Sequence, residues 1–133
     1  MDTSAITFAA GTIHRPSEPR HFMALAPVPG TVRIHWNGFL LAESRSATRL
    51  TEVGHQIYAP VIYVPRDDVT VDLLPSDRQS HCPLKGDCSW YSVEAPDGAD
   101  IAWSYETPFD FASDIKELVA FDAGRVTITE GPK

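Results

Sequence analysis

The sequence predicts an all-β fold, namely one compact antiparallel domain arranged as a sandwich or a partly open barrel, with at most one short helix. Three observations lead to this prediction. About seven to nine short segments have strand-like patterns and are bounded by turn residues. Eleven prolines and eight glycines argue against long helices. The length of 133 residues is that of a single domain.

Residues 1–30 contain four prolines and no sustained periodicity, so we expect an extended N-terminal arm, with residues 31–133 forming the β domain. The arm has large apolar side chains that could hold it against the domain or against a second subunit: Phe8, Phe22, Met23 and Leu25. A free tail is the alternative.

Residues 31–37 alternate apolar and polar side chains, and the pair Asn37-Gly38 follows them. Both central residues of a type I′ turn need positive φ, which makes this pair a strong hairpin signal. Residues 39–43 are expected to return as the partner strand.

The next expected strands cover residues 49–53, 57–65 and 69–74, and Pro60 and Pro65 predict an edge or bulged position for the second of them. Further along, two hairpins and one helical turn are expected, over these ranges: 86–94 with 100–105, 113–118 for the turn, and 118–122 with 125–130.

The formal net charge is −7 and is unevenly distributed. Residues 1–66 hold six Arg and Lys against four acids, whereas residues 67–133 hold five against fourteen. This acidity argues against a nucleic-acid binder, which needs a basic surface. A solvated acidic face is the simplest interpretation, and a face for a basic partner or a metal is the alternative.

No segment approaches the ~20 apolar residues of a membrane helix, and the N-terminus has no signal-peptide pattern. We therefore expect a cytoplasmic protein without a membrane partner.

The segment from Ser80 to Cys88 has the highest density of reactive side chains. A thiol needs a nearby positive charge to become a thiolate at neutral pH, and His81 and Lys85 could supply one to Cys82. A buried structural cysteine is the alternative. The C-x₅-C spacing without a second pair does not indicate zinc, so no metal or cofactor is predicted. A Cys82–Cys88 disulfide is unexpected in the cytoplasm.

Several motifs, in the same order, resemble the bacterial domain-of-unknown-function family numbered 427, which is sometimes labelled a nucleotidyltransferase-type domain. They cover roughly residues 31–128 and are Glu52, then Tyr58-x-Pro60-x-x-Tyr63-x-Pro65-Arg66-Asp67-Asp68-Val69, then Cys82-Pro83-x-Lys85-Gly86, then Ala102-Trp103-x-Tyr105-x-x-Pro108.

The resemblance implies a β-tent-like domain, an architecture also used by methionine sulfoxide reductase B and by zinc-binding exchange-factor proteins. Those relatives carry two metal-binding cysteine pairs that this sequence lacks. The residues give no support to a nucleotidyltransferase activity. The family usually has a small residue such as alanine at the position of Cys88. The matching positions nominate these site residues: Glu52, Tyr63, Arg66, Asp68, Cys82, Lys85, Trp103 and Tyr105.

Two functional hypotheses follow. The first is a small-molecule-binding or enzymatic domain in which Cys82, Lys85 and Glu52 are catalytic, beside the ligand-binding residues Tyr63, Arg66, Asp68, Trp103 and Tyr105. Lys85 would favour the thiolate or anchor an anionic ligand, and Glu52 would accept a proton or a hydrogen bond. The second is a non-catalytic interaction module that forms a homodimer through the arm or a strand edge.

Overall fold

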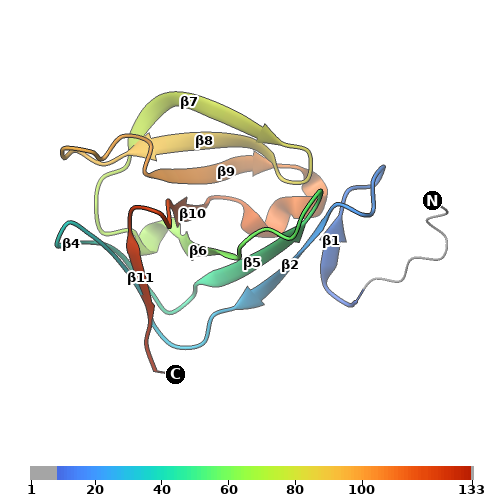
Figure 1. Cartoon of the computed structure of the whole chain (residues 1–133), viewed down its shortest axis with the longest axis horizontal. Coiled ribbons are helices and arrows are strands. Elements are labelled where there is room, and N and C mark those ends of the chain that lie inside the picture. Colours follow the sequence, from blue (N-terminus) through green and yellow to red (C-terminus); the bar gives the residue numbers. More distant parts are fainter. Residues whose placement is uncertain (1–8, 133) are drawn as a thin grey trace.

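The larger of two antiparallel sheets has eight strands and curls strongly, as the computed structural model shows (Figure 1). The structure describes residues 9–132. Within that range the strands of the larger sheet are, in spatial order, β1 (Thr12–His14), β2 (Phe22–Pro27), β5 (Thr48–Val53), β6 (Val61–Pro65), β10 (Leu118–Phe121), β9 (Ala102–Pro108), β8 (Gly86–Ser92) and β7 (Leu74–Cys82). The smaller sheet has the order β11 (Thr127–Glu130), β3 (Val32–Trp36) and β4 (Phe39–Ser44). The prediction of an antiparallel all-β fold that stays open is confirmed.

The β3–β4 hairpin forms as predicted. Trp36 pairs with Phe39, which leaves Asn37 and Gly38 as a two-residue loop. Their φ angles of 49° and 81° are both positive, as a type I′ turn requires. The helical turn predicted at 113–118 overlaps the 3₁₀ segment η3 (Asp110–Ile115), which begins and ends three residues earlier, and a second 3₁₀ turn, η2 (Arg66–Asp68), follows β6.

The edge position predicted for residues 57–65 is wrong. Strand β6 lies between β5 and β10, inside the sheet. It begins only after Pro60 and ends at Pro65, so neither proline occupies a position in the middle of the hydrogen-bonded ladder. The two prolines thus limit the length of the strand and not its place in the sheet.

Two other strand predictions need correction. Residues 69–74 form no continuous strand, and β7 starts at Leu74, where the sequence analysis expected a strand to end. The predicted third hairpin is also wrong, because β10 pairs with β6 and β9 whereas β11 pairs with β3 of the other sheet. Alternation alone identifies a strand without identifying its partner.

Residues of the predicted N-terminal arm form β1 and β2, and these strands extend the larger sheet beyond β5. Met23 on β2 is fully buried. Residues 1–8 of the predicted arm, with Phe8, lie outside the described residues.

Each face of the larger sheet covers its own apolar core. The first core lies between the two sheets and includes Ile34, Val64, Val119 and Phe121. The second gathers side chains from β2, β5, β6, β8, β9 and β10 with Ile115 of η3 into one cluster, so it fills the inside of the curl.

The curl brings the two ends of the larger sheet toward each other. At one end are β1, β2 and β5, and at the other is the β7–β8 hairpin, with η3 between them (Figure 1). We call the line along which these two ends approach each other the seam. Across residues 9–132, no helix has the length and apolar character needed to span a membrane.

Candidate functional site

A cavity of about 640 Å³ opens at the seam. It receives side chains from the β1–β2 connection, from β5 and the loop after it, and from the end of β7. Its lining residues are Arg15, Glu18, Arg20, His21, Glu52, Gly54, His55, Tyr58, His81, Cys82 and Pro83. A volume of this size is typical of small-molecule sites.

Glu52 is the central acid of this cavity. It lies two residues after Leu50 on β5, so both side chains point to the inside of the curl. Its Oε1 accepts a hydrogen bond from Nζ of Lys85, which lies in the β7–β8 turn at the other end of the sheet. The two side chains are 12% and 10% exposed. A nearly buried ion pair therefore links the two sides of the seam.

The environment keeps both members of this pair charged. Burial opposes ionisation of Glu52, but the hydrogen bonds from Lys85 and His21 outweigh it and hold the pKa of Glu52 below its ordinary value. Burial also opposes the charge on Lys85, but the acidic groups of Tyr63, Cys82 and Glu52 outweigh it and raise the pKa of Lys85. Glu52 is thus a weak base, better suited to accept hydrogen bonds than protons.

His21 precedes β2 and reaches the second carboxylate oxygen. Its Nε2 lies 2.8 Å from Oε2 of Glu52. An ionised carboxylate only accepts hydrogen bonds, so Nε2 must carry the proton and, in the neutral ring, Nδ1 has a free lone pair. Gly54 lies against the imidazole: a Cβ added to this glycine would be 3.4 Å from Cδ2 of His21. The carboxylate therefore fixes both the tautomer and the orientation of the ring.

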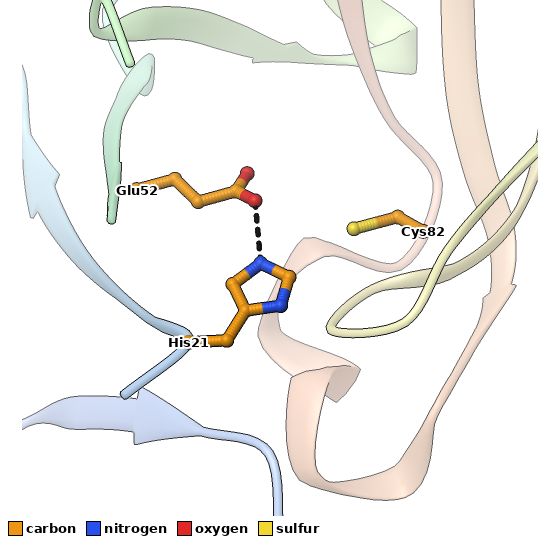
Figure 2. Close-up of side chains that lie close together, drawn as sticks. All are labelled: His21, Glu52 and Cys82. Atoms are coloured by element: carbon orange, nitrogen blue, oxygen red, sulfur yellow. Dashed lines mark hydrogen bonds and ion pairs between the residues drawn. The ribbon is translucent and has the colours of Figure 1, made fainter. Parts of the chain in front are cut away.

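Cys82 faces this pair from the opposite side of the seam (Figure 2). It ends β7, where it pairs with Gly86, and its thiol is partly exposed. Its Sγ, a ring nitrogen of His21 and a carboxylate oxygen of Glu52 all lie within 4.8 Å of one another. The arrangement is a thiol beside an imidazole whose other side is held by a carboxylate.

These three side chains also form the one group in residues 9–132 that offers ligand types suited to a transition metal. Zinc–ligand bonds of about 2.0–2.3 Å would bring the ligand atoms to within roughly 3.3–3.8 Å of one another. The ammonium group of Lys85 on Glu52 also repels a cation. The electrostatics thus favour proton transfer over metal binding at this place.

Three of the predicted aromatic residues lie beneath the cavity instead of lining it. Nε1 of Trp103 donates to the hydroxyl of Tyr63 at 3.3 Å, and Nζ of Lys85 lies 5.5 Å from the ring centroid of Tyr105. Burial raises the pKa of both tyrosines. These side chains belong to the apolar cluster inside the curl, on which Lys85 lies through its contact with Tyr105.

Arg66 and Asp68 are not brought to the cavity. Arg66 lies over the ring of Tyr91 and pairs with Glu106 at 3.7 Å, and its pKa is raised, chiefly by its hydrogen bond to the Tyr91 hydroxyl. Asp68 accepts a 2.6 Å hydrogen bond from Ser44. Both residues belong to η2, and within residues 9–132 the contacts of their side chains are made around that turn and not at the seam cavity.

The sequence analysis missed His21, Arg15 and Arg20, because it assigned them to an arm without a partner strand. The β2–β5 register places Met23 opposite Glu52, and so sets His21 next to that acid. A pairing across about thirty residues leaves no local signal in the sequence.

The second cysteine, Cys88, is a free and buried thiol whose pKa is raised, mainly by burial.

Comparison with known proteins identifies one family. A family model described as a domain of unknown function (DUF427) matches residues 24–131, which is most of the chain. No curated protein matches the sequence. The matched region includes Glu52, Cys82 and Lys85, while His21 lies just before it.

Proposed function

We propose, from the premise that this chain belongs to the DUF427 family, that the seam cavity binds a small molecule and that Cys82 acts on it as a nucleophile. The observation that carries the proposal is the convergence of Cys82, His21 and Glu52 on one cavity from opposite ends of the sheet. A nucleophile beside a base that a third group orients is a recurring arrangement for covalent catalysis.

The roles of His21, Glu52 and Lys85 follow from their hydrogen bonds, and that of Cys82 from the position of its Sγ within 4.8 Å of the other two ligand atoms. The thiol of Cys82 gives its proton to the imidazole of His21, and the sulfur electron pair forms a bond to an electrophilic carbon of the ligand. The electrons of the bond that breaks leave with the departing group, which takes the proton from the imidazolium if it needs one. Glu52 orients His21 by accepting a hydrogen bond from its Nε2, and Lys85 holds Glu52 in place.

The test is the alkylation rate of Cys82 with iodoacetamide at pH 7, located by peptide mass spectrometry. His21→Gln should slow the reaction at least about tenfold, since a positioned acid–base group contributes about 10²–10⁴-fold to enzymatic rates. His35→Gln, in the smaller sheet, is the matched control and should leave the rate unchanged. Equal rates in the native and His21→Gln proteins would refute the role of the imidazole.

Simple binding without chemistry is distinguished by the same experiment. A native protein whose Cys82 reacts no faster than a free thiol, while ligands still occupy the cavity, would have a binding function only.

A further inference from the structure

The wall of the seam cavity is rich in basic side chains although the whole chain is acidic. Five of its lining residues are arginines or histidines, and two are carboxylic acids. The basic ones are Arg15, Arg20, His21, His55 and His81, and the acids are Glu18 and Glu52. The chain as a whole has a net charge of −7, so the basic wall is a local feature.

Both acids of the wall are already neutralised by neighbours. Arg20 donates two side-chain hydrogen bonds to Glu18, at 2.8 and 2.7 Å, and these lower the pKa of Glu18 to about 2. Glu52 is held by Lys85 and His21. Neither carboxylate therefore has the unsatisfied charge that would attract a cationic ligand.

Arg15 is the charge that remains. Within the described residues its side chain makes no hydrogen bond or ion pair, although it lies close enough to Glu18 to lower the pKa of that acid slightly. The two lining arginines equal the two glutamates in number, and Lys85 behind Glu52 is offset by Asp87, which lies 2.8 Å from Nδ1 of His81. The unpaired guanidinium of Arg15 is thus the source of a local positive field. A cleft focuses such a field, because its low-dielectric walls screen it less than bulk water does.

We propose that the ligand of this cavity carries an anionic oxygen group, a carboxylate or a phosphate, which Arg15 and Arg20 bind while its reactive carbon faces Cys82. The proposal rests on the proposed function and names its substrate class. A guanidinium presents paired donors that match the oxygens of either group. The imidazole of His55 lines the same cavity and is a further donor for such a group.

The test compares two reagents of nearly equal size, the anion iodoacetate and the neutral amide iodoacetamide. The rate of Cys82 with iodoacetate is divided by its rate with iodoacetamide. This ratio is measured in the folded protein and in the urea-unfolded chain, where the thiol is unperturbed. The cavity should raise this ratio about tenfold on folding, and 1 M salt should remove most of the gain. An unchanged ratio in a reactive Cys82 would overturn the anion proposal and leave the nucleophile intact.

Substitutions that remove a positive or a negative charge from the cavity wall should change this rate ratio in opposite directions. Arg15→Gln should lower the ratio severalfold, whereas Glu18→Gln should raise it, because it removes the negative partner of Arg20. Arg33→Gln, on the smaller sheet and paired with Glu43, is the matched control and should have no effect. Equal ratios in all three variants would contradict the proposed anchor. Arg15, Glu18 and Arg33 are not needed to hold the core together, so each variant should fold. Thermal unfolding checks this.

A second measurement does not depend on the thiol. Inorganic phosphate should bind the native protein in the millimolar range, as followed by NMR chemical shifts of the cavity residues, and Arg15→Gln should weaken this binding severalfold. If Cys82 proves unreactive toward both reagents while phosphate binds through Arg15, the nucleophile is refuted and the anion site is supported. If phosphate does not bind and the reagent ratio is unchanged, the anion site is refuted.

Discussion

Replacing Lys85 by methionine tests the ion pair that joins the two ends of the larger sheet. The substitution keeps the length of the side chain and its packing over Tyr105, but leaves the Glu52 carboxylate without its ammonium partner. Breaking a buried ion pair costs about 3–5 kcal/mol. Because His21 still binds Glu52 and the cavity admits water, we expect a loss of about 2–3 kcal/mol in the free energy of unfolding. In a chain of this length that corresponds to a fall in Tm of about 6–15 °C.

The pH dependence gives this prediction a second signature. The pKa of Glu52 is lowered on folding, so the stabilisation is complete above the unfolded-state value of about 4.3 and is lost as the pH falls through the folded-state value. The pKa of Lys85 is raised, so the stabilisation is complete below about 10.4 and is lost as the pH rises through the folded-state value. The stability difference between native protein and Lys85→Met should therefore shrink as the pH falls below about 4.3 or rises above about 10.4.

The assay is urea unfolding at pH 7 of the native protein, Lys85→Met, Glu52→Gln and the double variant. The double variant should be more stable than the sum of the single losses predicts, with a coupling energy of about 1.5–3 kcal/mol. Lys116→Met, which removes an exposed lysine, is the control and should change stability by less than about 0.5 kcal/mol. A Lys85→Met protein as stable as the control, with zero coupling to Glu52, would refute the ion pair as a link across the seam.

Three further predictions concern the fold and the second cysteine. Ile34→Ala, in the core between the two sheets, should lower the free energy of unfolding by about 2–4 kcal/mol in urea, and a loss below 1 kcal/mol would contradict that core. Gly38→Ala should cost about 1 kcal/mol by the same assay because φ is +81° there, and a gain in stability would argue against the type I′ turn. Cys88→Ala should cost less than about 1.5 kcal/mol and leave the alkylation rate of Cys82 unchanged, since the Cys88 thiol is buried. A slower Cys82 in that variant would mean that the two thiols act together.

The sequence was most informative where the decisive contact is local. Asn37 and Gly38 specify their hairpin because the turn geometry depends on these two residues alone. The structure places Glu52 next to both Lys85 and Cys82. The sequence analysis nominated these residues from the reactive segment around Cys82 and from a resemblance between ordered motifs, and their roles stay a prediction. Local sequence patterns do not tell how far apart those motifs lie in the folded protein.

Long-range pairing explains what the sequence analysis missed. Strand β11 alternates as a hairpin partner of β10 would, yet it crosses to the other sheet, and nothing in its own residues marks that choice. Arg66 resembled a site residue because it lies within a matching motif, but β6 ends at Pro65 and directs it toward Tyr91. His21 became visible as a site residue only once β2 was paired with β5.

The most direct test of the central claim is the alkylation rate of Cys82 at pH 6.5 in the folded protein, divided by the rate of the same cysteine in the urea-unfolded chain. A thiol beside the His21–Glu52 pair should react at least about tenfold faster when folded, because the imidazole takes its proton in place of water. A folded protein in which Cys82 reacts at the same rate as in the unfolded chain, or more slowly, would contradict the account.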